Sequence, residues 1–328
     1  MGDWVSGYRI VGQIGVGAHS TIHHAVRATT GKSYAIKRVV NEGPDDARFI
    51  AQVEAEYQVS HAVKHPNLRY SYSIHRTKKL LAVQEVRVVM EYVEGQTLQD
   101  RRPGTLDAFL YIFHRVAAGL CALHEAGYVH ADIKPNNIIA GKNGVVKIID
   151  FGQACPMGHR KGRIQGTPDY IAPEQVQRAP LDKRTDVFNL GATMYWVLTE
   201  VPFPTAIRQP TRRGGIDLVS PETLRTPREI NPLIPGPLSQ LVMDCCEENP
   251  QGRPPDMKVV MSRLQIVQTL WNKKRNEARA KHKAALDAPR QESGTTRNAG
   301  PGPTETPPAK TENRPDAIET QEGKTRSE

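Results

Sequence analysis

Apolar and polar residues alternate along the amino-terminal part of the chain with the period expected of β-strands. Two apolar strands flank a glycine-rich turn in the range 8–26. A third strand is predicted at 34–37, where the alternation places Lys37 on the same face as Ala35. An apolar run at 85–93 predicts a further buried strand. This region is therefore predicted to be mostly β.

Helical periodicity appears once within this region and dominates the chain after it. The range 45–64 begins polar and then becomes helical, and Pro66 follows it as a stop. Apolar residues recur on one side of the range 106–127, which ends at a glycine. Both ranges are predicted to be amphipathic helices that cover a core.

The later part of the chain is predicted to be helical on either side of a long connection. An apolar helix begins near Asp186, and the last core helices are expected at 238–246 and 257–271. The range 201–237 is rich in proline and arginine, so it is predicted to be a surface connection.

The end of the chain changes character twice. The range 273–283 carries one acidic residue among many bases, which favours a solvated helical extension over a contact with nucleic acid or an anionic surface. From 287 onward there is almost no large apolar residue to bury. The expected parts are therefore a small lobe at 8–93, a large lobe at 94–271, a basic helical extension at 272–286 and a disordered polar tail at 287–328.

Composition narrows the class of protein. The chain has 328 residues and a net charge of +9, which phosphate-handling enzymes tolerate. Its four cysteines show no metal-type spacing, so we expect buried thiols in a reducing cytoplasm. Neither a signal peptide nor a stretch of transmembrane length is apparent in the pattern, so we expect a cytoplasmic protein without a transmembrane segment.

The segment VHADIKPNNII at 129–139 places polar residues between two short apolar stretches. Here Asp132 can orient a hydroxyl and Lys134 can hold a phosphate. Asn137, and Asp150 after the next apolar run, supply the oxygen ligands that Mg²⁺ prefers. The pattern is typical of a loop that catalyses phosphoryl transfer.

The order H-x-D-x-K-x-x-N followed by D-F-G is highly specific, and the chain resembles a eukaryotic-like (Hanks-type) serine/threonine protein kinase of the bacterial branch. The resemblance extends over residues 8–270. It implies an α+β fold of two lobes, one mostly β and one mostly helical, with ATP and Mg²⁺ bound between them. It also implies transfer of the γ-phosphate of ATP to Ser or Thr hydroxyls of protein substrates.

The resemblance assigns nucleotide-binding roles to the small lobe and the hinge. Gly15 and Gly17 would close over the phosphates, while Ser20 stands where the pattern has a third glycine. The hinge is the end of the strand at 85–93, where the backbone of Glu91 and Val93 would bond the adenine edge. Met90 would gate the back of the pocket. The further nucleotide contacts are expected from Ile14, Ile22, Ala35, Met90, Glu91, Val93 and Ile139.

A buried ion pair is expected beside the phosphates. Lys37 would bind the α- and β-phosphates and pair with an acid of the helix at 45–64. Glu56 has the family spacing before His65, whereas Glu54 faces elsewhere on the helical wheel. Glu56 is therefore the predicted partner.

The resemblance also assigns the chemical step. Asp132 would accept the proton of the substrate hydroxyl, and Lys134 would neutralise charge on the transferred phosphate. Thr167 would reach back to both, and Asn137 and Asp150 would hold Mg²⁺.

Further residues are expected to support these groups. Glu174 would pair with Arg253, and Asp186 would accept hydrogen bonds from the backbone of the catalytic loop. His130 would stack under Phe151 as a core residue rather than act as a base.

One departure from the family pattern concerns regulation. Ala131 occupies the place of an arginine that, in kinases switched by loop phosphorylation, needs an anion. The range 153–166 contains no Ser, Thr or Tyr. We therefore predict activity without an activating loop phosphate, with any autophosphorylation mainly on the tail.

Two other functions are weighed against this one. A pseudokinase scaffold is suggested by Ser20 and by Ser60, where the family packs an apolar residue, but the expected catalytic residues are all present. A small-molecule phosphotransferase would lack the segment GTPDYIAPE at 166–174 and the matching Arg253.

Overall fold

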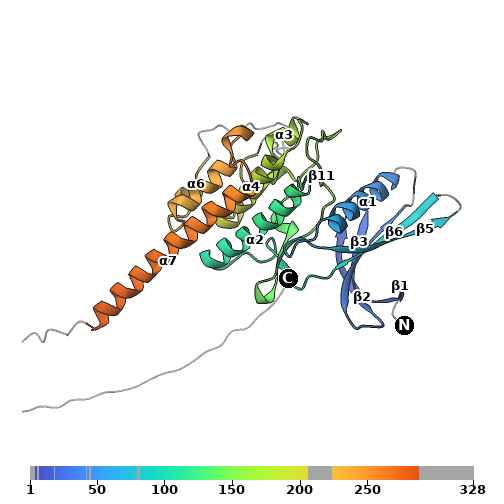
Figure 1. Ribbon diagram of the computed structural model, residues 1–328, viewed down its shortest axis with the longest axis horizontal. Helices are drawn as coiled ribbons and strands as arrows, with labels where there is room; N and C mark the ends of the chain where they lie inside the picture. Colours follow the sequence, from blue (N-terminus) through green and yellow to red (C-terminus); the bar gives the residue numbers. More distant parts are fainter. Residues whose placement is uncertain are drawn as a thin grey trace, which may run out of the picture. The chain divides into compact units, whose positions relative to one another are not determined.

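The structure is a computed structural model that describes residues 4–5, 7–17, 19–41, 43, 46–79, 82–205 and 224–287. Contacts divide the chain into one unit, Met1–Ala280, and a second that begins at Lys281. The first unit contains a small lobe and a large lobe (Figure 1). The predicted tail from 288 onward, and residues 206–223 of the predicted surface connection, lie outside the described residues.

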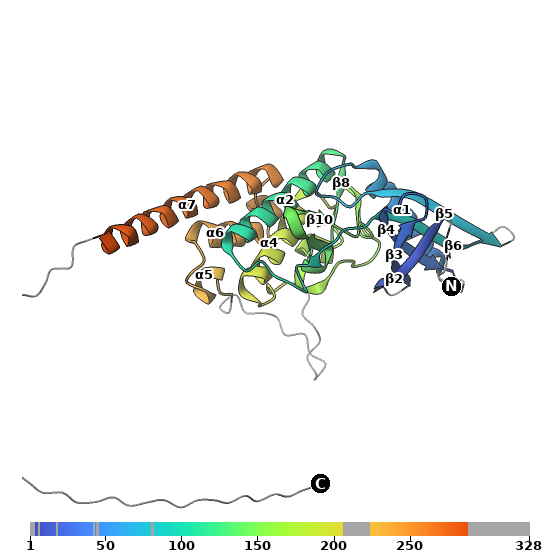
Figure 2. The same cartoon turned by 90° about the horizontal axis from the view of Figure 1, so that it is seen from below.

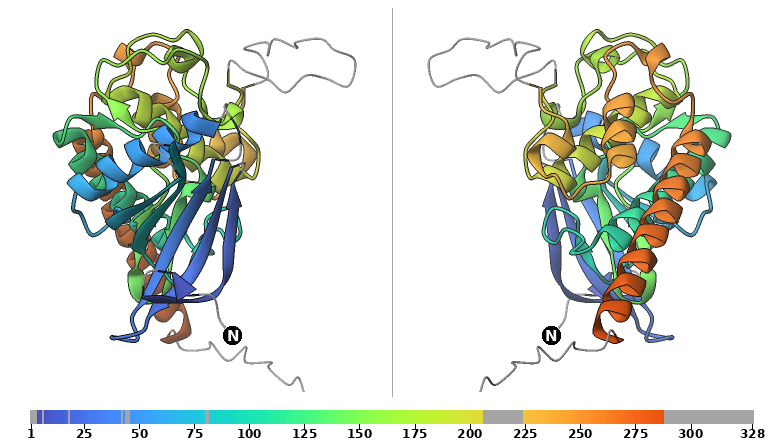
Figure 3. Two further views of the ribbon diagram at one scale, coloured as in Figure 1. Left: turned by 90° about the vertical axis from the view of Figure 1, so that its right-hand side faces the viewer. Right: turned by 90° about the vertical axis from the view of Figure 1, so that its left-hand side faces the viewer.

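The small lobe is a six-stranded antiparallel sheet with a helix packed on one face (Figure 1). The strand order is β1-β2-β3-β4-β6-β5, and β2, β3 and β4 lie side by side in the left view of Figure 3. The elements are β1 (Trp4–Val5), β2 (Tyr8–Gly17), β3 (Ser20–Arg27), β4 (Ser33–Val40), α1 (Ala47–Ala62), β5 (Ser71–Lys79) and β6 (Ala82–Glu91). The sheet therefore begins before residue 8, where the small lobe was predicted to start, because β1 pairs with β2.

The register of the sheet decides which side chains meet helix α1. Ala35 pairs with Met90 and Lys37 pairs with Val88, so both β4 residues share one face as the alternation predicts. The apolar side chains of that face form a buried cluster with Ile50 and Val53 of α1. Helix α1 ends where Val63 turns to extended backbone, three residues before Pro66.

The large lobe is mostly helical, with short strands on the side that carries the catalytic loop (Figure 2). Its helices are α2 (Leu106–Glu125), α3 (Pro173–Val176), α4 (Lys183–Thr199), α5 (Pro227–Ile230), α6 (Gly236–Cys245) and α7 (Met257–Asp287). Its strands are β7 (Gln96–Thr97), β8 (Tyr128–Val129), β9 (Ile138–Ala140), β10 (Val146–Ile148) and β11 (Cys155–Pro156). Short 3-10 turns are η2 (Pro135–Asn137), η3 (Lys142–Gly144), η4 (Pro168–Tyr170) and η6 (Pro250–Gly252).

Helix α2 corrects one expectation about membranes. In the described part of the chain it is one helix that is long and apolar enough to cross a bilayer, whereas no stretch of that length was expected. Its apolar residues Phe113, Val116 and Leu120 are completely buried in the core of the large lobe. This burial accounts for the hydropathy of α2 as that of a core helix.

The predicted surface connection at 201–237 is wrong at both of its described ends. Phe203 and Ile234 are buried, and α5 lies between them. Helix α5 starts with a capping box in which Thr226 and Glu229 exchange hydrogen bonds, and Pro227 occupies its first turn. This sequence signal was present but was interpreted as proline-rich coil.

Helix α7 runs beyond Trp271 through the predicted basic extension and ends at Asp287, one residue into the predicted tail. The extension is not solvated throughout, because Arg275 donates to the carboxylate of Asp107 at the start of α2 over 2.5 Å. Arg275 also donates to Asn272 over 2.8 Å.

Candidate active site

The catalytic loop follows β8 and is anchored by a buried carboxylate on α4. The backbone N–H groups of His130 and Ala131 each donate to Asp186 over 2.8 Å. His124 of α2 contacts the same carboxylate at 2.7 Å. Burial opposes the charge of Asp186, but these partners outweigh it and hold its pKa below the usual value of 3.8. The predicted link between Asp186 and the loop backbone is thus present.

Two residues of the site adopt the left-handed backbone conformation. Ala131 has φ of 59° and Asp150 has φ of 67°. An alanine in this region costs about 1 kcal/mol, and the two charged hydrogen bonds to Asp186 offset that cost. Aspartate tolerates the conformation better, and the Gly152 N–H donates to Asp150 Oδ1 over 3.1 Å.

Asp132, Lys134 and Thr167 form one cluster although they come from two separate segments. Thr167 donates through its N–H and its hydroxyl to Asp132 Oδ1, over 3.1 and 2.9 Å. Lys134 Nζ lies 2.8 Å from Asp132 Oδ2 and 2.7 Å from Thr167 Oγ1. The predicted return of Thr167 to both residues is therefore present in the geometry.

The lysine of β4 lies between two carboxylates. Lys37 Nζ is 2.5 Å from Glu56 Oε2 and 3.9 Å from Asp150 Oδ1. Glu54 points to the other side of α1, where it accepts a hydrogen bond from Arg76 over 2.5 Å. Of the two acids weighed from spacing, Glu56 is the one that pairs with the lysine.

The charges of this group sustain one another. Burial disfavours the charged form of Lys37, but Glu56 and Asp150 outweigh it and raise the pKa of the lysine above 10.5. Burial likewise disfavours the charged form of Asp150, but Lys37 and the Gly152 N–H hold its pKa below 3.8. At neutral pH Lys37 is therefore a cation and Asp150 an ionised carboxylate, the form that binds a metal ion.

Asn137 and Asp150 are suited to Mg²⁺ by their chemistry. The Asn137 side-chain nitrogen donates to the Asp132 carbonyl over 2.8 Å, which leaves its amide oxygen as the metal-binding atom. An amide oxygen and a carboxylate are hard ligands, and phosphate oxygens would complete the shell. Within the described residues there is no cluster of three or more His, Cys, Asp or Glu side chains that could hold a metal by itself. The residues present thus fit a metal that arrives with the nucleotide.

The glycine-rich hairpin joins β2 to β3. Gly17 pairs with Ser20, and a Cβ on Gly17 would lie 2.7 Å from the Ser20 hydroxyl. The serine that replaces the third glycine therefore occupies the space beside Gly17. Next to it, the His19 ring stacks on Phe49 of α1 with ring centroids 3.6 Å apart. The hairpin tip is thus attached to the helix that carries Glu56.

The residues predicted to surround adenine come from both lobes. Met90 is buried behind Ala35, its partner in the sheet. Ile139 on β9 meets the hinge, since a Cβ on Gly95 would lie 2.7 Å from its side chain. Among the other predicted contacts, Ile14 is exposed, whereas Ile22 and Val93 are half-buried.

One hinge group is less available than predicted. The Glu91 N–H donates to the Tyr70 carbonyl over 2.8 Å, so only the Glu91 carbonyl remains for an adenine edge. This pairing could not be read from the apolar run alone, because it depends on which segment lies beside the end of β6.

His130 and Phe151 pack together in the core beneath the site. His130 is completely buried, and its ring is tilted rather than stacked on Phe151, with centroids 5.4 Å apart. Further along this interior, Ser60 Oγ lies 2.6 Å from the Ser71 hydroxyl and 2.8 Å from the Glu56 carbonyl. Ser60, which was one reason to weigh a pseudokinase scaffold, therefore has hydrogen-bond partners for its hydroxyl in this interior.

The segment after Thr167 is closed by a buried ion pair. Arg253 donates to both oxygens of Glu174, over 2.7 and 3.0 Å. The same guanidinium donates to the carbonyls of Glu247 and Arg184. The predicted structural pair is present.

Sequence reasoning missed Gln175, a buried glutamine that joins several parts of the site. Its side-chain nitrogen donates to the carbonyls of Ala131 and Gln165, over 2.8 and 3.2 Å. Its oxygen accepts from the Ala172 N–H and from Asn189, over 3.0 and 2.9 Å. A neutral amide thus links the catalytic loop to the segment that carries Thr167.

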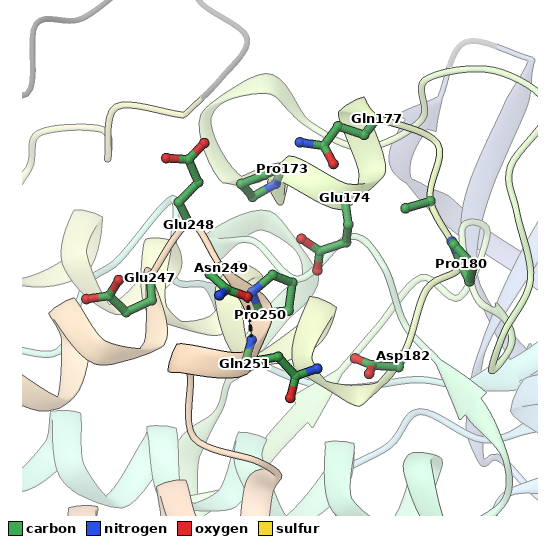
Figure 4. A pocket seen from close by; sticks show the side chains of 11 residues that line it. Pro173, Glu174, Gln177, Pro180, Asp182, Glu247, Glu248, Asn249, Pro250 and Gln251 are labelled. Atoms are coloured by element: carbon green, nitrogen blue, oxygen red, sulfur yellow. Dashed lines mark hydrogen bonds between the residues drawn. The ribbon is translucent and has the colours of Figure 1, made fainter.

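A separate hollow of about 670 Å³ lies between the end of α3 and the connection from α6 to α7 (Figure 4). Its lining includes the carboxylates of Glu174, Asp182, Glu247 and Glu248, and none of the residues predicted to bind nucleotide, Mg²⁺ or the substrate hydroxyl. Carboxylates repel phosphates, so this hollow is not suited to the nucleotide.

The two-lobed fold and the paired Lys37–Glu56 and Asp132–Thr167 groups define a protein of the phosphoryl-transfer class. A sequence profile described as the protein kinase domain matches residues 8–265. The chain belongs to the protein kinase domain family, and the resemblance drawn from its motifs is confirmed.

Curated relatives named serine/threonine-protein kinase match the chain at modest sequence identity. The chain is 27% identical over 269 residues to a probable serine/threonine-protein kinase of Clostridium acetobutylicum, which covers 79% of this chain and 40% of the relative. It is 27% identical over 283 residues to serine/threonine-protein kinase PknD of Chlamydia pneumoniae, which covers 75% and 29%. It is 29% identical over 259 residues to PknA of Corynebacterium glutamicum, which covers 76% and 54%. The chain therefore spans little more than half, or less, of the length of these relatives.

Proposed function

We propose that this chain transfers the γ-phosphate of ATP to Ser or Thr hydroxyls of proteins, and that it does so without a phosphate on the segment 153–166. Family membership supports the reaction class, and the relatives carry the name serine/threonine-protein kinase. The observation that carries the proposal has two parts. The Lys37–Glu56 pair and the Asp132–Thr167 contact are both formed, and the catalytic loop is held by the neutral side chain of Gln175 rather than by a charged group.

In the proposed reaction Asp132 receives the substrate hydroxyl. The substrate hydroxyl donates a hydrogen bond to the Asp132 carboxylate, which Thr167 and Lys134 contact in the structure. Asp132 then accepts the proton of the hydroxyl. Lys134 is placed to neutralise charge on the moving phosphate, and Lys37 holds the phosphates that stay with the nucleotide. Mg²⁺ held by Asn137 and Asp150 would neutralise the charge of the phosphates.

Independence of loop phosphorylation is supported by what orders the loop. In kinases switched by phosphate, a cationic cluster stays unbalanced until the anion arrives. Here Ala131 supplies no cation and Gln175 links the two segments as a neutral group. Lys161 of this loop donates to the Gln153 carbonyl over 2.6 Å. Order in this loop thus rests on groups that need no added anion.

The proposal is tested by incubating the protein with labelled ATP, Mg²⁺ and a Ser/Thr-containing protein substrate. Asp132→Asn should lower transfer by about 100-fold or more, because the proton acceptor is lost. Gln177→Leu, on the exposed end of α3, is the matched control and should retain the wild-type rate. Wild-type protein without transfer, or Asp132→Asn with near-native transfer, would contradict the assignment.

We also propose a reducing, cytoplasmic location. All four cysteines are free thiols, and Cys155, Cys245 and Cys246 are buried. Burial raises the pKa of Cys245 to about 12, which keeps this thiol protonated and unreactive. Fluorescence microscopy of the tagged chain would test the location, and an extracellular signal would refute it.

A further inference from the structure

Arg69 is a buried cation that the reaction scheme does not use. It lies in the short segment before β5 and is only 6% exposed. Its N–H donates to the Ile148 carbonyl over 2.9 Å, which fixes its backbone beside β10. Strand β10 leads directly to Asp150, so the segment of Arg69 is held against the approach to the metal-binding carboxylate.

The guanidinium of Arg69 reaches the same carboxylate as Lys37. Its Nη2 atom is 3.6 Å from Glu56 Oε1, while Lys37 occupies Oε2 at 2.5 Å. Glu56 Oε1 is buried and makes no hydrogen bond in the described structure. A distance of 3.6 Å is an ion pair rather than a hydrogen bond. Arg69 is therefore the cation that pairs with this second oxygen of Glu56.

Other polar contacts bind α1 to the same segment. Ser60 donates to the Ser71 hydroxyl over 2.6 Å, and the His61 ring contacts the Ser71 carbonyl at 2.8 Å. On the other side, Gln52 donates to the Gly152 carbonyl over 3.1 Å. The orientation of α1 is thus set by directional contacts as well as by apolar packing. Among these contacts, that of Arg69 is made to Glu56, the residue that pairs with the phosphate-binding Lys37.

We propose that Arg69 is a positioning residue: as the second cation on Glu56, it holds that carboxylate, and with it α1, in the orientation that pairs Glu56 with Lys37. The inference rests on the proposed function, because Arg69 would anchor α1 from within the small lobe without a phosphate on the segment 153–166. The arginine does not touch the reacting atoms and acts through Glu56.

The mobility of α1 reports which role Arg69 has. If Arg69 were only a nearby cation, its removal would leave the backbone amides of α1 as protected from hydrogen exchange as before. If Arg69 holds Glu56 in place, its removal frees the glutamate, and the amides of α1 exchange faster. The two roles therefore predict different outcomes.

The first experiment is a double-mutant cycle on the full chain, with kcat and KM for ATP measured for wild type, Arg69→Met, Glu56→Gln and the double variant. Arg69→Met should lower kcat/KM by about 10-fold or more, and should cause no further loss once Glu56 is glutamine. Arg76→Met is the matched control, because Arg76 pairs with Glu54 on the exposed side of the same helix. Equal losses in both backgrounds, or no loss, would overturn the proposal.

The second experiment needs no turnover, so it separates this inference from the proposed function. Hydrogen exchange of the backbone amides of α1 is followed by mass spectrometry. Arg69→Met should speed their exchange, with no further effect beside Glu56→Gln, and unchanged exchange would overturn the proposal. If Arg69→Met lacks the cooperative thermal unfolding of wild type, Arg69→Lys enters both experiments, with a smaller loss that must also vanish beside Glu56→Gln.

Discussion

Replacing Gln175 with leucine removes four hydrogen bonds from a buried position while keeping a side chain of similar size. The amide of Gln175 serves the carbonyls of Ala131 and Gln165, the Ala172 N–H and the Asn189 side chain. Each net hydrogen bond contributes about 1 kcal/mol, so the loss should be about 4 kcal/mol of unfolding free energy. That is a large share of the roughly 5–15 kcal/mol that stabilises a typical domain, but not all of it.

Activity should fall more steeply than stability. Without the amide, the segment that carries Thr167 loses its link to the catalytic loop, and Asp132 loses a fixed partner. Gln175→Glu tests the two donated bonds, because it keeps an acceptor for Ala172 and Asn189 but, as a carboxylate, cannot donate to the carbonyls of Ala131 and Gln165. Its charge is buried against these two carbonyls, so this variant should lose transfer activity and at least as much stability as Gln175→Leu.

The assay combines urea unfolding with phosphate transfer at a temperature where every variant is folded. Gln177→Leu, two residues further along, is the control and should change neither quantity. The reasoning is refuted if Gln175→Leu unfolds within about 1 kcal/mol of wild type. It is also refuted if Gln175→Glu transfers phosphate at the wild-type rate, since the link between the two segments would then be dispensable.

Two further predictions concern stability. Arg253→Met leaves Glu174 buried without its partner, so urea unfolding should show a loss of about 3–5 kcal/mol, partly recovered when Glu174→Gln is added; an unchanged midpoint would contradict the pairing. Burial lowers the pKa of His130 below 6.5, despite the opposing charge of Asp186. Unfolding therefore takes up a proton below about pH 6.5, and stability should decline as the pH falls through that value. The slope of unfolding free energy against pH should be shallower in His130→Asn, and an equal slope would show that another group titrates.

The parts of the site that could be predicted from sequence are those fixed by local spacing. Asp132, Lys134 and Asn137 lie within one tight loop closed by Pro135, so their order alone indicates their arrangement. The choice of Glu56 over Glu54 followed from the family spacing before His65, and the helical period places the two side chains on different sides of α1.

The parts that were missed depend on contacts between distant segments. Gln175 and Ala131 are separated by 44 positions, and a glutamine within a short helical turn carries no pattern of its own. Arg69 follows the end of α1, where an arginine is ordinarily solvated, and its burial depends on the distant partners Ile148 and Glu56. Helix α5 differs, since its capping box was visible in the sequence.

We propose that this kinase domain is active as synthesised. The most direct measurement is the progress curve of substrate phosphorylation by phosphatase-treated wild-type protein, started with ATP and Mg²⁺. We expect a linear curve from the first time point, with no phosphate on Thr167 when the reaction is analysed by mass spectrometry. A lag that shortens as the protein concentration rises, together with phosphate accumulating on Thr167, would contradict it.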